Sequence, residues 1–200
     1  MVDDTATRDS AQWTISPPTA WDTSSFAGLR AIIREDKKAK SRSWQDAGFQ
    51  AIVVHRVGEW IGGGGCPPLL RRPAKMLHKY MRGYVRNLEG FDIGTGARLG
   101  RRVRFHHQHG VVIDDHAVIG DDCVFRHGVT LAINPKADSP KSLLAAPQIG
   151  SRVTFGVGCI VLGGVRIGDG ANIGPNAVVT TDVPPGASAV AQPARVLRIR

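Results

Sequence analysis

Histidines crowd one short stretch of this chain, and an aspartate stands before it. The segment 105–110 reads Phe-His-His-Gln-His-Gly, and its middle histidine, His107, follows Asp92 by 15 residues. An imidazole can take a proton from a hydroxyl group near neutral pH, and a carboxylate can orient the ring and stabilise the imidazolium that forms. These residue types therefore indicate general-base chemistry on a hydroxyl-bearing substrate, if the fold brings Asp92 and His107 together.

A repeat of six residues organises the chain around these side chains. A helix repeats its apolar face every 3.6 residues and a strand every 2, whereas hexads are the signature of a parallel β-helix. Three hexads, about 18 residues, make one triangular coil with an apolar residue pointing inward from each side. The inward positions are Ile93, Leu99, Phe105, Ile113, Ile119, Phe125, Leu131, Ile149, Phe155, Val161, Ile167, Ile173 and Val179.

Two irregularities interrupt this repeat. Two extra residues separate Phe105 from Ile113, at the histidine cluster, and an insert follows Leu131. Since Asp92 and His107 lie three residues less than one coil apart, we expect them to approach each other across a corner. Residues that break a repeat are where function is expected, because the repeat itself serves the fold.

The rest of the chain divides around the β-helix. Three helices with apolar stripes are expected from about Phe26, over 47–61 and over 69–88. The fold class is therefore mainly β, a parallel β-helix with a small N-terminal α-helical domain. The expected units are a flexible tail over 1–22, the α-helical domain over 23–90, the β-helix over 91–190 with a loop at 132–148, and a basic tail over 191–200.

Composition narrows the function classes. The net charge of +9 is concentrated between positions 30 and 104, but no recognisable nucleic-acid module accompanies it. No apolar run approaches the roughly 18 residues of a membrane span. The polar N-terminus does not resemble a signal peptide, so a cytoplasmic location is expected. Cys123 and Cys159 fall on inward repeat positions, which argues against a catalytic thiol.

Several motifs together resemble one family of acyltransferases. They are Gly48-Phe49-Gln50-Ala51-Ile52, His55-Arg56, Asp92-Ile93, His107 before Gly110-Val111-Val112-Ile113, Ala117-Val118-Ile119-Gly120-Asp121-Asp122, Gly128-Val129-Thr130-Leu131, Asp182-Val183-Pro184-Pro185-Gly186 and Pro193-Ala194-Arg195. From about position 49 to 196 the chain is similar to the serine O-acetyltransferases, which are left-handed β-helix proteins with hexapeptide repeats.

The resemblance implies direct acetyl transfer from acetyl-CoA, as co-substrate, to the hydroxyl group of serine or a related small molecule. His107 matches the family's general base and Asp92 the carboxylate that orients it. His106, His109 and His127 are candidate substrate contacts. The resemblance also implies a homotrimer or a dimer of trimers, with CoA in a groove between neighbouring β-helices and no metal. The expected CoA contacts are Gly156, Val157, Gly158, Pro175 and Arg195.

The chain departs from the family pattern where the acceptor is held. Members that make O-acetylserine carry an Arg-His pair in the insert that grips the serine carboxylate, whereas this chain has Ala145-Ala146. His106 replaces the family's aspartate beside the catalytic histidine. These differences keep a sugar or polysaccharide-precursor hydroxyl open as an alternative acceptor.

Two other classes remain open. Five histidines between positions 106 and 127 raise a zinc site of the γ-carbonic-anhydrase type, although their spacing does not match that family's ligands. A non-catalytic hexapeptide scaffold would have no activity for a His107 substitution to remove.

Overall fold

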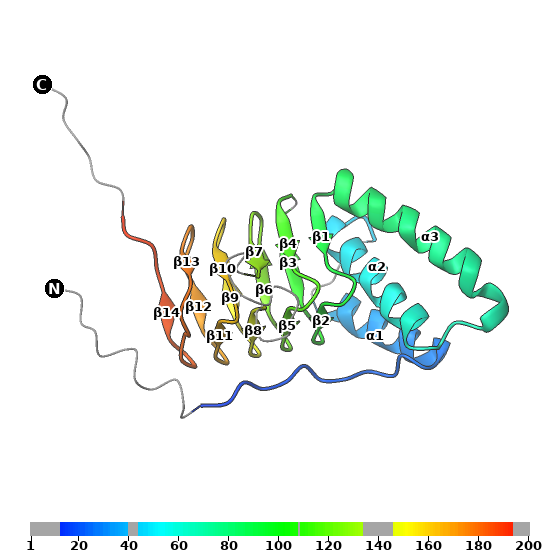
Figure 1. Ribbon diagram of the computed structural model, residues 1–200, viewed down its shortest axis with the longest axis horizontal. Helices are drawn as coiled ribbons and strands as arrows, with labels where there is room; N and C mark the ends of the chain where they lie inside the picture. Colours follow the sequence, from blue (N-terminus) through cyan, green and yellow to red (C-terminus); the bar gives the residue numbers. More distant parts are fainter. Residues whose placement is uncertain (1–12, 40–43, 108, 134–145, 194–200) are drawn as a thin grey trace, which may run out of the picture.

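The computed structural model describes residues 13–39, 44–107, 109–133 and 146–193. Figure 1 shows a stack of short strands with three helices gathered at one end of the stack. The expected parallel β-helix with a small N-terminal helical domain is confirmed.

The helices are α1 (Phe26–Lys38), α2 (Ala47–Gly62) and α3 (Pro68–Asn87). The hydroxyl of Ser25 accepts a hydrogen bond from Gly28 N at the start of α1, and the carboxylate of Asp46 accepts one from Phe49 N at the start of α2. Among the described residues no side chain caps α3, which begins at a proline and contains Pro73 in its interior. None of the helices in the described ranges is long and apolar enough to cross a membrane.

The strands are β1 (Phe91–Ile93), β2 (Arg98–Leu99), β3 (Arg104–His106), β4 (Val111–Ile113), β5 (Val118–Ile119), β6 (Val124–Arg126), β7 (Thr130–Ala132), β8 (Gln148–Ile149), β9 (Thr154–Phe155), β10 (Ile160–Leu162), β11 (Arg166–Ile167), β12 (Asn172–Ile173), β13 (Val178–Val179) and β14 (Ser188–Ala189). They form three parallel sheets, ordered β1-β4-β7-β10-β13, β11-β8-β5-β2 and β14-β12-β9-β6-β3. Each sheet is one side of the triangular coil, so every strand pairs with its counterparts in the coils beside it.

The inward positions of the repeat form a continuous apolar core. Phe105, Phe125 and Phe155 occupy equivalent positions in three successive coils, and their ring centroids are 5.3 and 4.5 Å apart. Cys123 and Cys159 are both completely buried. The sequence prediction that the repeat marks the inward face is therefore confirmed at these positions.

One buried arginine fastens the helices to the first coil. The guanidinium of Arg56, on α2, lies 3.1 Å from Asp36 Oδ2 and 3.0 Å from Glu59 Oε2. It also donates to the carbonyl oxygens of Leu99 (2.9 Å) and Gly100 (2.6 Å) in the β-helix. Since Arg56 is fully buried, its charge depends on these partners for all of its solvation.

The segment before α1 differs from the flexible tail expected over 1–22. Its described part, 13–22, runs along one edge of the β-helix (Figure 1, dark blue). Thr19 N donates to Asp121 Oδ1 (3.0 Å), Ser16 N donates to Asp169 Oδ1 (3.2 Å), and the carbonyl of Trp13 accepts from Arg166 (2.6 Å). Polar side chains of the second coil (Asp121) and of the fourth (Arg166 and Asp169) therefore hold this segment. Residues 1–12 and 194–200, the latter within the expected basic tail, lie outside the described residues.

We expect Arg56→Leu to destabilise the protein by about 3–5 kcal/mol, because it leaves the carboxylate of Asp36 buried without its cation. Urea denaturation followed by circular dichroism would measure the loss. Arg98→Leu, which changes an exposed arginine on β2, is the matched control and should cost far less. Equal stability of the two variants would contradict the assignment of Arg56 as the fastening residue.

Candidate active site

The two-residue irregularity lies at one corner of the β-helix. His106 pairs in register with Arg126 of the next coil. The backbone N–H that follows His127 donates to the carbonyl of His109 (3.1 Å), and one coil later Gly158 N donates to the carbonyl of His127 in the same way (3.0 Å). His109 therefore corresponds to His127, and the two residues between His106 and His109 have no counterpart in the next coil.

His107 is the first of these two extra residues. Its side chain is exposed, so it does not point into the apolar interior. Its backbone has a positive φ of 68°, and His109 follows with a φ of 75°. Such conformations cost non-glycine residues free energy and collect at functional sites. The ring of His107 meets the ring of His127 edge-on, with centroids 5.8 Å apart.

Among the described residues, the predicted histidines and CoA contacts share one edge of the prism, which we call the histidine edge: 106–107, 109–110, 126–128, 156–158 and 174–176. Gly110, Gly128 and Gly158 follow one another along it, each with positive φ. A Cβ added to Gly110 would lie 3.3 Å from Gly128 Cα, and one added to Gly128 would lie 3.3 Å from Gly158 Cα. The coils thus stack tightly here and leave the edge without side chains at these positions.

The candidate substrate-binding and CoA-binding residues on this edge differ in how far they are exposed to solvent. His106 and His127 are partly buried, His109 and Pro175 are exposed, Gly156 is buried, and Val157 is partly buried. His127 Nδ1 is buried and has no hydrogen-bond partner among the described residues. Arg195 lies outside the described residues, as does Ala145.

Asp92 lies on the outer side of β1, on the sheet that follows the histidine edge. Its carboxylate is half exposed and forms an ion pair with Arg82 of α3, with 3.7 Å between Oδ1 and Nη2. Within the described ranges no hydrogen bond or ion pair joins Asp92 to His107. The backbone ladder joins His109 to Glu89, so Asp92 and His107 flank one corner, but the predicted pairing of their side chains stays a prediction because the carboxylate is engaged by Arg82.

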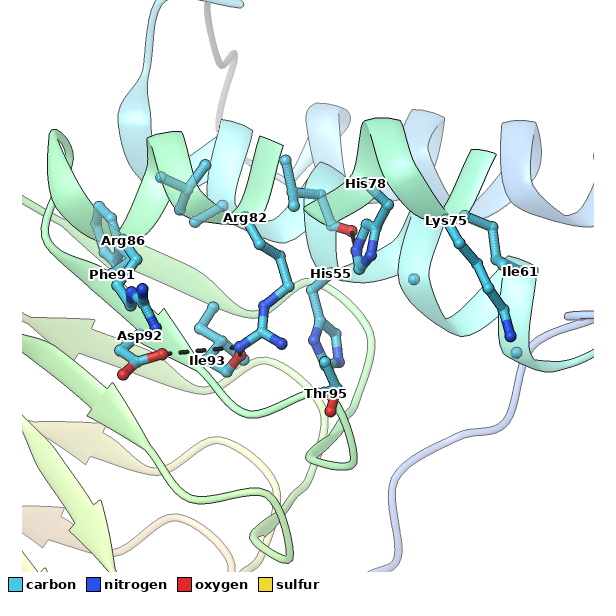
Figure 2. Close-up of a pocket in the computed structure, with 15 residues that line it drawn as sticks. His55, Ile61, Lys75, His78, Arg82, Arg86, Phe91, Asp92, Ile93 and Thr95 are labelled. Carbon is cyan, nitrogen blue, oxygen red and sulfur yellow. Dashed lines mark hydrogen bonds and ion pairs between the residues drawn. The ribbon is translucent and has the colours of Figure 1, made fainter. Parts of the chain in front are cut away.

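Asp92 also borders a cavity of about 180 Å³ between α2, α3 and β1. Figure 2 shows Arg82 reaching from α3 toward Asp92 and Ile93, with His55 of α2 beside it. Arg82 Nη2 also donates to the carbonyl of Ile93 (3.1 Å), so one nitrogen of the guanidinium contacts both residues of β1.

Sequence reasoning missed Glu89, which lies where α3 meets the first coil. Its carbonyl accepts a hydrogen bond from His109 N (3.3 Å), and its side chain is buried with Oε2 unpaired among the described residues. Burial, with a smaller contribution from Asp46, raises the pKa of the Glu89 carboxyl. The sequence did contain a signal that could have singled it out, because no acidic residue stands between Glu59 and Glu89.

A catalytic thiol does not fit Cys123 or Cys159. Burial raises the pKa of Cys123 to about 12 and that of Cys159 to about 12, so both remain protonated at neutral pH. Among the described residues, no group of three or more His, Cys, Asp or Glu side chains is arranged to hold a metal ion.

Comparison with known proteins places these features in a family. A family model described as bacterial transferase hexapeptide (six repeats) matches residues 146–181. The serine acetyltransferase of Mycobacterium tuberculosis is 38% identical over 75% of this chain and 60% of its own length. That of Helicobacter pylori strain 26695 is 32% identical over 84% of this chain and 94% of its own length. The chain thus spans about three fifths of the first relative and nearly all of the second.

A solved structure agrees with these relatives. The serine acetyltransferase of Brucella abortus in complex with coenzyme A superposes with a TM-score of 0.68 and 26% identity, over 85% of this chain and 68% of that one. The coiled fold and its matched repeats define a hexapeptide-repeat transferase. Within that class, the chain belongs to the serine acetyltransferase family.

We expect iodoacetamide to leave Cys123 and Cys159 unmodified in the folded protein at mildly alkaline pH, because both thiols are buried and protonated. Peptide mass spectrometry after alkylation, with and without denaturant, would measure this. Alkylation of either thiol at the same rate in both conditions would contradict the inward placement.

Proposed function

We propose that the protein transfers an acetyl group from acetyl-CoA directly to a hydroxyl group of serine or a related small molecule. The observation that carries this proposal is the position of His107, which the two-residue insertion lifts out of the coil onto the histidine edge. Membership of the serine acetyltransferase family supports the reaction class.

In the proposed reaction His107 is the general base. Its neutral imidazole takes the proton of the acceptor hydroxyl while that oxygen attacks the thioester carbonyl. The new C–O bond gives a tetrahedral intermediate, which collapses by breaking the C–S bond, and the departing CoA thiolate takes the proton from the imidazolium. Backbone N–H groups stabilise the oxyanion of the tetrahedral intermediate. Asp92 would orient the His107 ring after acceptor binding. This requires that the acceptor displaces Arg82 from the Asp92 carboxylate, or that the carboxylate rotates toward the histidine edge.

The later coils of the histidine edge are the proposed CoA site, with contacts from Gly156, Val157, Gly158 and Pro175. Gly156 and Gly158 have no side chains to project from this part of the edge. A long, thin ligand could therefore lie along the backbone there. The family likeness to a CoA complex supports the assignment. Arg195 is a further proposed contact for a CoA phosphate.

We infer that a neighbouring β-helix completes the proposed CoA site, so that CoA lies in a groove between two subunits. The assembly would be a homotrimer or a dimer of trimers. Two features support assembly. Val112 and Val178 are exposed on the sheet that carries Asp92, and α3 exposes a long apolar stripe: Leu69, Leu70, Met76, Leu77, Tyr80 and Tyr84. Isolated monomers rarely leave so much contiguous apolar surface in water. A cytoplasmic location remains part of this proposal.

A sugar hydroxyl is the second candidate acceptor. It is favoured by the end of the insert, where Ala146 is completely buried and has no group that could grip a carboxylate. Members of the family that act on serine carry an Arg-His pair there, according to the resemblance stated above. The serine carboxylate would therefore need a different partner in this chain.

His107→Ala should reduce the rate of acetyl transfer by about 10²–10⁴-fold, the usual contribution of a positioned general base. A thiol-release assay with acetyl-CoA would measure it. His116→Ala is the matched control, because His116 lies at another corner, between β4 and β5, beside Asp114. A loss of only a few-fold for His107→Ala would place the base elsewhere.

Free serine should be a weak acceptor, because alanine replaces the carboxylate-binding pair. The same assay with serine, homoserine, threonine and nucleotide-linked or lipid-linked sugars would rank the acceptors by kcat/KM. A Michaelis constant for serine within the ordinary enzyme range would contradict this expectation and favour serine over the sugars.

A further inference from the structure

One sheet of the prism carries positive charge with no negative charge of its own. Its strands β3, β6, β9, β12 and β14 contain two arginines, Arg104 and Arg126, and no acidic residue. Elsewhere in the β-helix, Arg101, Arg102 and Arg166 each form an ion pair with a carboxylate. Within the described ranges Arg104 and Arg126 form no ion pair, and Arg104 Nε has no hydrogen-bond partner. The outer face of this sheet therefore attracts anions.

Arg126 projects outward where this sheet meets the proposed general base. Phe125 is completely buried, and since successive side chains of a strand alternate between faces, Arg126 points outward and is exposed. It pairs in register with His106, whose strand lies about 4.8 Å away. The residue after Arg126 is His127, whose ring meets the ring of His107. The guanidinium and the proposed base therefore belong to the same corner of the prism.

This position fits an anionic group of the acceptor. A guanidinium can give two parallel N–H donors to a carboxylate or phosphate, which adds direction as well as strength to the contact. In a small acceptor only a few bonds separate such a group from the hydroxyl that reacts at His107, so one corner can bind both. The phosphates of CoA fit less well, because the pantetheine arm separates them from the thioester that must reach His107.

We propose that Arg126 binds the carboxylate or phosphate group of the acceptor and so selects anionic acceptors. The inference rests on the proposed acetyl transfer, because it takes His107 as the place where the acceptor hydroxyl reacts. Arg126 supplies part of what the Arg-His pair supplies in family members that act on serine, since this chain has Ala145-Ala146 there. A single arginine offers fewer hydrogen bonds than that pair, so free serine remains a weak acceptor.

Pairs of acceptors with and without the anionic group test this role. The thiol-release assay would compare L-serine with L-serinamide, and glucose 1-phosphate with methyl glucoside. Arg126→Gln should lower kcat/KM for the anionic member of the preferred pair by about 10–100-fold, mainly through KM, because a hydrogen bond to a charged group is lost. The neutral member should change by less than about twofold, because it makes no such bond. Arg126→Lys keeps the charge without the planar fork and should give an intermediate value.

Arg98→Gln is the matched control. Arg98 is an exposed arginine on β2, in a different sheet, and like Arg126 it forms no ion pair within the described ranges. Its substitution should leave kcat/KM for every acceptor within about twofold, because a charge on another side of the prism is screened by salt. Both arginines are exposed, so neither substitution should disturb folding, which circular dichroism would check.

A binding measurement without acetyl-CoA examines the anion site independently of turnover. Inorganic phosphate and acetate would be titrated into the full chain at constant pH and ionic strength, with chloride as the balancing anion, while the histidine ring signals are followed by NMR. We expect saturable shifts of the His107 or His127 signals with at least one of the two anions. Arg126→Gln should raise the dissociation constant by about tenfold, whereas Arg98→Gln should leave it unchanged.

The outcomes separate the anion site from the proposed function. Absence of saturable shifts with both anions, or equal weakening by Arg126→Gln and Arg98→Gln, would overturn the inference. Equal losses of kcat/KM for the anionic and the neutral acceptor would also overturn it, while acetyl transfer itself would stand. Saturable binding at Arg126 in a protein that transfers no acetyl group would keep the anion site but refute both its assignment to an acceptor and the proposed function.

Discussion

Backbone hydrogen bonds between equivalent positions of successive coils are the constraint on which this molecule depends. Each strand is completed by the strands before and after it, and the inward side chains stack on their own counterparts, as Phe105, Phe125 and Phe155 do. Such a ladder accepts extra residues only at a corner, where they leave the pairing on both sides unchanged. The insertion before His109 is of this kind. It projects one imidazole outward while the coils above and below stay in register.

The periodic part of the structure could be predicted from the sequence because it depends on local repetition. The hexads marked Cys123 and Cys159 as inward, and both are fully buried. The break in the repeat drew attention to His107. In the structure, residues within the repeat stack on equivalent residues of the next coil, whereas His107 has no equivalent there. Stacking also aligned the histidines with Gly156 and Gly158, since equal corners of a prism fall on one edge.

Contacts between non-repeating segments could not be predicted in this way. The partner of Asp92 is Arg82, and it depends on how α3 lies against β1, which no period encodes. The burial of Glu89 arises at the same junction. The segment before α1 has a polar composition that resembles a disordered tail, yet the coil corners supply acidic residues such as Asp121 and Asp169 at the spacing it needs. Such matching is visible only in three dimensions.

That N-terminal segment changes how the solenoid should come apart. In a stack whose coils touch only their neighbours, the last coil can fray while the others persist. Here Ser16 bonds to Asp169 in a late coil, whereas Ala20 bonds to Arg101 in the first. A short stretch of chain therefore braces coils that have no contact with one another. Loss of the outer coils must break this brace as well, which makes melting more cooperative than the repeat alone would allow.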